Sequence, residues 1–223
     1  LIFSIALGLL NLWLVSRLAS IYTSVPWLVV LLFSTLPAFL VFHHSIGLAS
    51  IGLALALSAL LCIRSKYSRF ASVFLIILSI LSFREAIIAL AISIAWYQYR
   101  KESLALLASG FQALALLIHL LYGMHPEPSN IIFELGGISG IPIIILLLST
   151  AGLYLLWGAR SKFYPVLGAL LGTALLSFID EGALLYVGVP LSFLSAASLL
   201  RFGKRDWDIP FLRSAIFIIV GFS

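Results

Sequence analysis

Long apolar runs separated by short polar segments fill almost the whole chain. A bilayer core about 30 Å thick needs roughly 20 apolar residues per helix, with a range of about 17–25. The runs show no strict apolar/polar alternation, and lipid-exposed backbone must satisfy its own N–H and C=O groups, so helices are favoured over a barrel. The pattern predicts an all-α, polytopic transmembrane bundle of about ten spans. With ends placed to within a few residues, the runs are about 1–16, 26–42, 46–63, 70–83, 86–99, 103–122, 138–158, 164–179, 183–200 and 210–223.

Two of these runs, 70–83 and 86–99, are short for a bilayer. A helix rises 1.5 Å per residue, so either run reaches only about 21 Å. Such helices thin the bilayer, tilt little or are sheltered by neighbours. A buried hairpin that does not cross the membrane is the alternative interpretation. Two crossings are favoured because the charges of the flanking loops then alternate between sides.

Composition agrees with a membrane environment. The 223 residues are 63% hydrophobic and 9% charged, with a mean hydropathy of +1.21, whereas a soluble domain carries about 25% charged residues. The chain therefore reads as an integral membrane protein with a single transmembrane helical domain over residues 1–223. The net charge of +5 does not indicate nucleic acid, because the basic residues are confined to short loops.

The loop charges predict which side of the membrane each loop faces. One set of loops holds nearly every Lys and Arg, and the positive-inside rule makes these loops cytoplasmic. The alternate set holds the histidines and most acids and is predicted to be extracytoplasmic. The basic residues of the predicted cytoplasmic loops are Arg17, Arg64, Lys66, Arg69, Arg100, Lys101, Arg160, Lys162, Arg201, Lys204 and Arg205.

Four residues on the predicted outer side are candidates for a phosphate site: the donors His43, His44 and Arg84, with Glu85 beside Arg84. His43 and His44 interrupt an apolar stretch and can donate two N–H groups each when protonated. Arg84 breaks the charge asymmetry of its side, and a guanidinium fork suits phosphate geometrically. The plainer interpretations are histidines wetted by lipid headgroups and an Arg84 compensated locally by Glu85.

Further outer-side residues are candidates for metal or proton chemistry. The carboxylates could ligate a divalent cation or act as a general base, and no motif fixes their geometry. Solvated loop acids are the alternative, and no metal site is predicted from spacing. These outer-loop candidates are His125, Glu127, Glu134, Asp180 and Glu181.

The order of these elements resembles the GT-C superfamily of membrane glycosyltransferases. This superfamily includes protein O-mannosyltransferases, lipid A aminoarabinose transferases and oligosaccharyltransferase catalytic subunits. The likeness is in layout and covers most of the chain. It includes a Pro-containing span ending in a polar turn (Pro37 to Ser45), two short spans joined by Arg84-Glu85, a long outer loop, and a late span opened by Asp180 to Pro190.

The resemblance implies that a sugar is transferred from a polyprenyl-phosphate carrier at the extracytoplasmic face. Arg84 matches a basic residue near the carrier phosphate, with His43 and His44 lining the same cavity. The family's catalytic acid lies in the first outer loop, which is expected upstream of Leu1, so the chain is expected to be a piece of a longer protein. Many members also carry Arg-Tyr before the late helix, whereas Leu185 precedes Tyr186 here.

Two other functions fit the same pattern. A lipid or small-molecule transporter or flippase would use the outer polar residues as a gate. The absence of Asp, Glu, Lys and Arg from the middles of the runs argues against ion coupling but not against lipid movement. A noncatalytic scaffold subunit of a larger membrane complex is the third hypothesis. The partners expected throughout are membrane lipids and the polyprenyl-phosphate-linked sugar.

Overall fold

The computed structural model describes residues 2–44, 48–65, 67–122, 141–156, 172–174, 176 and 182–204. Side chains are described in these ranges except at 41–44, 156, 203 and 204. Within this part of the chain the secondary structure is helical and contains no strand. The helices are α1 (Ile2–Tyr22), α2 (Pro26–Ser34), α3 (Pro37–His44), α4 (Leu48–Arg64), α5 (Ser68–Leu81), α6 (Phe83–Arg100), α7 (Ser103–Leu121), α9 (Ile143–Leu156) and α11 (Ala183–Lys204).

Three of these helices are long and apolar enough to cross a membrane. They are α1, α7 and the Ala183–Phe202 part of α11, while α4, α5 and α9 are apolar but shorter. Over the described residues the all-helical prediction is confirmed, and three helices have the length and composition of membrane spans. A total of about ten crossings stays a prediction, because the runs 164–179 and 210–223 lie outside the described residues apart from 172–174 and 176.

The predicted run 26–42 is divided into two helices. Helix α2 ends at Ser34, and α3 begins at Pro37. Proline has no N–H, so Pro37 cannot donate to the Phe33 carbonyl four residues earlier. The Leu36 N–H donates to that carbonyl instead, at 3.2 Å. The hydrophobic pattern alone misses this interruption because the residues around it are all apolar.

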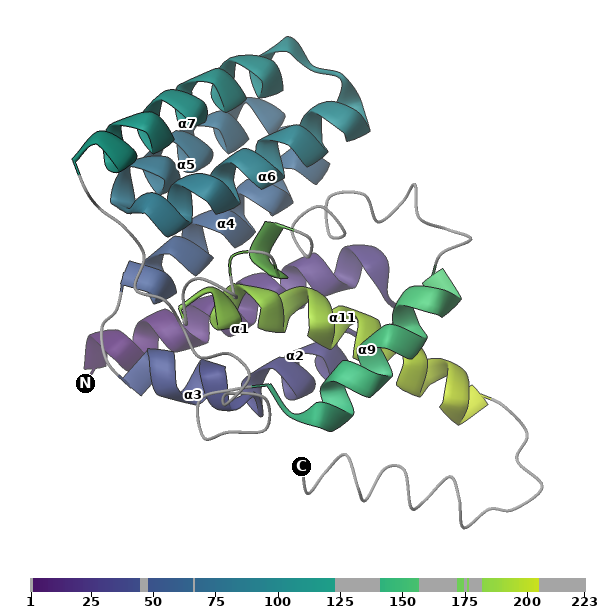
Figure 1. The fold of residues 1–223 in the computed structure, drawn as a ribbon. Helices are drawn as coiled ribbons and strands as arrows, with labels where there is room; N and C mark the ends of the chain where they lie inside the picture. The colour runs from purple at the N-terminus through teal and green to yellow at the C-terminus, as the bar shows by residue number, and fades with distance from the viewer. Residues whose placement is uncertain are drawn as a thin grey trace.

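The helices form two packed groups joined through α1 and α4 (Figure 1). Helices α4 to α7 pack in one group, and α11 packs on α9, α2 and α3 in the other. Helix α11 is the central element, since 89% of its membrane-length window is buried, against 28% for α7. The part of α7 that is not buried against other helices is therefore the surface that lipid would cover.

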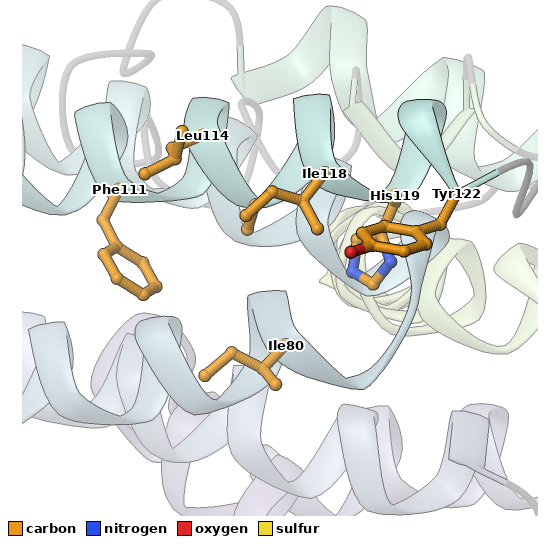
Figure 2. Close-up of a pocket in the computed structure, with 7 residues that line it drawn as sticks. Ile80, Phe111, Leu114, Ile118, His119 and Tyr122 are labelled. Atoms are coloured by element: carbon orange, nitrogen blue, oxygen red, sulfur yellow. The ribbon is translucent and has the colours of Figure 1, made fainter.

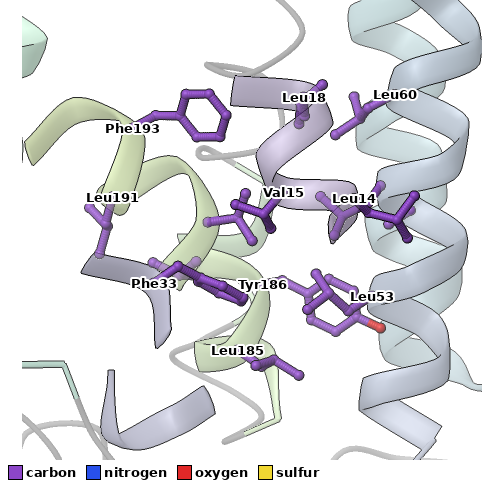
Figure 3. Close-up of a cluster of buried hydrophobic side chains, with 14 of the residues drawn as sticks. Leu14, Val15, Leu18, Phe33, Leu53, Leu60, Leu185, Tyr186, Leu191 and Phe193 are labelled. Carbon is purple, nitrogen blue, oxygen red and sulfur yellow. The ribbon is translucent and has the colours of Figure 1, made fainter. Parts of the chain in front are cut away.

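A continuous apolar core surrounds α11. Figure 3 shows side chains of α1, α2 and α4 converging on it. Trp96 and Phe33 are the largest fully buried side chains. The core residues labelled in Figure 3 are Leu14, Val15, Leu18, Phe33, Leu53, Leu60, Leu185, Tyr186, Leu191 and Phe193.

Helix α7 is attached by small residues and two polar side chains. Its buried face consists of Ala105, Ala108, Gln112, Ala115 and His119. Oriented to satisfy both ends of its amide, Gln112 donates to the Ser93 hydroxyl at 2.8 Å. The Nε2 atom of His119 lies 3.1 Å from the Ser79 carbonyl oxygen. Small side chains and interhelical hydrogen bonds are how helices associate where lipid removes the hydrophobic driving force.

Candidate functional site

The connection between α5 and α6 places a carboxylate inside the bundle. Ser82 is the only residue between the two helices, and its extended backbone (φ −164°, ψ 173°) reverses the chain direction. Ser82 and Glu85 have the Ser-x-x-Glu spacing of a helix start. The Ser82 hydroxyl here donates to Glu85 Oε2. Glu85 thereby sits in the first turn of α6, where the helix dipole favours a negative charge.

Glu85 is fully buried and surrounded by donors. Its Oε1 atom accepts from Arg84 Nε at 2.9 Å and from Arg84 Nη2 at 2.8 Å. The hydroxyl of Tyr186, from the first turns of α11, donates to the same oxygen at 3.1 Å. A buried carboxylate is tolerated only when it is paired and hydrogen-bonded in this way.

A glycine makes room for this arrangement. A Cβ atom at Gly52 of α4 would overlap the Tyr186 hydroxyl and lie 2.9 Å from Glu85 Cγ. We call Gly52, Ser82, Arg84, Glu85 and Tyr186 the Glu85 cluster. The cluster joins α4, α6 and α11 at the end of the bundle where all three helices begin.

Replacing Gly52 with alanine is expected to push the Tyr186 hydroxyl away from Glu85. Overpacking costs about 1–3 kcal/mol, so the free energy of unfolding in detergent micelles should fall by about 1–2 kcal/mol. In a Tyr186→Phe background the hydroxyl is already absent, so the same substitution should have a smaller effect. An equal loss in both backgrounds would show that Gly52 and the Tyr186 hydroxyl do not interact.

Arg84 is the cationic member of the cluster, and it is only partly buried. Its side chain is 14% exposed, whereas that of Glu85 is 0% exposed. The two hydrogen bonds to one carboxylate oxygen hold the plane of the guanidinium in a fixed orientation. A guanidinium carries five N–H donors in a rigid fork, which suits phosphate oxygens. The structure thus brings Arg84 and Glu85 together as a partly buried ion pair, and the local compensation of Arg84 by Glu85 is confirmed.

The structure places His43 and His44 in a helix and not in the predicted turn, since they are the last two residues of α3. Helix α4 begins at Leu48, one helical turn before Gly52. Only the backbone of His43 and His44 is described, so their contacts with the cluster stay a prediction. The outer-loop candidates His125, Glu127, Glu134, Asp180 and Glu181 lie outside the described residues. In the described part, no group of three or more His, Cys, Asp or Glu side chains could hold a metal ion.

The opposite end of the bundle is basic. The Arg64 guanidinium lies 5.1 Å from the centroids of both the Tyr22 and Tyr99 rings and donates to the Tyr99 hydroxyl. Arg100 donates to the Ser65 carbonyl at 3.3 Å. These contacts fasten the ends of α1, α4 and α6 by cation–π and hydrogen-bond interactions. This basic end and the Glu85 cluster therefore lie at opposite ends of α4 and α6. Which end faces which side of the membrane stays a prediction.

A groove of about 280 Å³ runs between α5 and α7 (Figure 2). Its walls are almost entirely apolar: Ile80 faces Phe111, Leu114 and Ile118. His119 and Tyr122 lie at one end. That end is next to the end of α5, because His119 contacts Ser79, three residues before Ser82. The groove is chemically suited to a hydrocarbon chain.

The sequence analysis did not identify three members of the cluster: Gly52, Ser82 and Tyr186. The pairing of Ser82 with Glu85 could have been predicted, because the two residues have the Ser-x-x-Glu spacing. Tyr186 is 101 residues from Glu85 and has no such signal. Gly52 is one of the chain's 16 glycines, and only the packed structure distinguishes it.

No protein-family model, curated protein or solved structure matches this chain.

Proposed function

We propose that the chain is the membrane part of a glycosyltransferase that moves a sugar from a polyprenyl-phosphate carrier to an acceptor at the extracytoplasmic face. The observation that carries the proposal is the orientation of Arg84 by a fully buried carboxylate. A guanidinium stays charged without a carboxylate partner, so we infer that Glu85 fixes the orientation of the Arg84 guanidinium. Preorganised donors of this kind are the main means by which enzymes stabilise developing charge.

The carrier phosphate is proposed to bind at Arg84. When the bond between the sugar and the phosphate breaks, negative charge grows on the leaving phosphate oxygen. A fixed guanidinium stabilises that charge without having to reorient. The apolar groove between α5 and α7 supports a lipid carrier over a water-soluble sugar donor.

Binding of a polyprenyl phosphate to the purified protein in nanodiscs tests this assignment. Hydrogen bonds to charged groups contribute about 1.5–3 kcal/mol, so Arg84→Gln should raise the dissociation constant about tenfold or more. Arg84→Lys keeps Glu85 paired but lacks the planar fork, and it should also weaken binding. The matched control is Arg69→Gln. Arg69 is an exposed arginine and the second residue of α5.

The corresponding polyprenol, which lacks the phosphate, separates recognition of the phosphate from recognition of the chain. We expect it to bind with the same affinity to the wild type and to Arg84→Lys. Equal affinities of the wild type and both Arg84 variants for the polyprenyl phosphate would contradict the proposal. Movement of the intact lipid-linked sugar across vesicles, without release of its sugar to any acceptor, would instead indicate a flippase.

A further inference from the structure

Two helical segments of the core contain a proline that removes a backbone hydrogen bond. Pro37 separates α3 from α2, and Pro190 lies inside α11. Proline has no N–H, so Pro190 cannot donate to the Tyr186 carbonyl, as Pro37 cannot donate to the Phe33 carbonyl. Each helix therefore has one turn that resists bending less than the rest, and sharp helix bends occur at such turns.

The two weakened turns are in contact. A Cβ atom at Gly188 would lie 2.6 Å from Leu36 Cδ1 and 3.4 Å from the Phe33 ring. Phe33 and Leu36 are fully buried, and Figure 3 shows Phe33 packed against α11 beside Tyr186. The turns before Pro37 and before Pro190 thus lie at the same level of the core, on helices that face each other.

A hydrogen bond connects the weakened turn of α11 to the Glu85 cluster. Tyr186 is four residues before Pro190 and donates to Glu85 at 3.1 Å. On the far side of the two weakened turns lie α3, which ends at His44, and the first turn of α11, which begins at Ala183. Both segments lead to the end of the bundle that holds the Glu85 cluster.

We infer that Pro37 and Pro190 form a paired hinge, and that the Tyr186–Glu85 hydrogen bond is its latch. When the bond breaks, α3 and the first turn of α11 bend together away from α4 and α6. Packing of Leu36 against Gly188 couples the two bends. That the bending opens the carrier site rests on the proposed function, whereas the bending itself does not.

Distances between nitroxide spin labels can measure the bend in α2–α3. Trp27 and Leu40 are exposed and lie on opposite sides of the interruption. The labels are attached to cysteines at these two positions in a Cys62→Ser background, with the protein in nanodiscs. Tyr186→Phe removes one hydrogen bond to a charged group and should raise the bent population about tenfold, as a second, separate distance or a broad distribution.

The matched control is a label pair at Leu107 and Leu121, two exposed positions on the uninterrupted α7. Its distance distribution should stay narrow in every variant. Pro37→Ala restores the missing N–H, so the double variant with Tyr186→Phe should keep a single Trp27–Leu40 distance. Thermal unfolding of each labelled variant verifies that it remains folded.

An unchanged Trp27–Leu40 distribution in folded Tyr186→Phe would overturn the hinge. Equal broadening of the α7 control pair would also overturn it, because it would mean general loosening. The outcome is independent of the carrier: a protein that bends as expected but binds no polyprenyl phosphate contradicts only the proposed function. One that binds the lipid through Arg84 but does not bend contradicts only the hinge.

Discussion

Replacing Glu85 with alanine is expected to lower the free energy of unfolding by about 3 kcal/mol. Removing one partner of a buried ion pair costs about 3–5 kcal/mol, because the other charge is left without compensation. The lower end of this range applies since the Arg84 side chain is 14% exposed and its stem can extend toward the surface. Tyr186 and Ser82 lose their acceptor at the same time. Denaturant unfolding in mixed micelles measures the change.

The matched control is Glu102→Ala. Glu102 also pairs with an arginine, Arg100, at 3.3 Å, but both side chains are about a third exposed. Exposed pairs contribute about 0–1 kcal/mol, so this substitution should lower the free energy of unfolding by less than about 1 kcal/mol. Similar losses for Glu85→Ala and Glu102→Ala would mean that the burial of Glu85 does not determine its contribution.

Replacing Gly152 with alanine is expected to lower the free energy of unfolding by about 3 kcal/mol, near the upper end of overpacking costs. A Cβ atom there would overlap the carbonyl oxygen of Leu194 and lie 2.6 Å from its carbonyl carbon. These are backbone atoms, so no side-chain rotation can relieve the overlap, and α9 must move away from α11. The bonds from Ser195 to the Ile145 carbonyl and from Ser198 to the Leu148 carbonyl would be disturbed as well.

Gly110→Ala serves as the control for this substitution. Gly110 is a helical glycine of α7, and a Cβ atom there would have nothing within 4 Å. Alanine favours helix by about 1 kcal/mol over glycine, so the free energy of unfolding should stay the same or rise slightly. Comparable destabilisation at both positions would show that loss of glycine, and not the contact of α9 with α11, is responsible.

Helix positions follow closely from the hydrophobic pattern. Helix α7 covers almost the same residues as the predicted run 103–122, and α4 nearly matches 46–63. This agreement is expected because a chain in lipid has few alternatives to helix. The interruption before Pro37 was not predicted, since apolar residues lie on both sides and the loss of a single backbone hydrogen bond leaves no trace in hydropathy.

One contact of the candidate site could be predicted from the sequence. The pairing of Arg84 with Glu85 was one of two interpretations of this dipeptide, because a lone cation near lipid needs a partner, and the structure shows the pair. The depth of Glu85 could not be predicted, since the same dipeptide would suit an exposed turn. The pairing of Glu85 with Tyr186 depends on how the start of α11 packs near α4, and only tertiary structure determines that.

The central position of α11 has a consequence for biosynthesis. The core residues of α1, α2 and α4 emerge from the ribosome long before residue 183, and until then the side chains that fill the space between them do not exist. Until α11 has been synthesised, helices α1, α2 and α4 lack the helix against which their core side chains pack. Products of premature termination before residue 183 are therefore expected to be degraded quickly in the cell, even though most of their helices are already inserted.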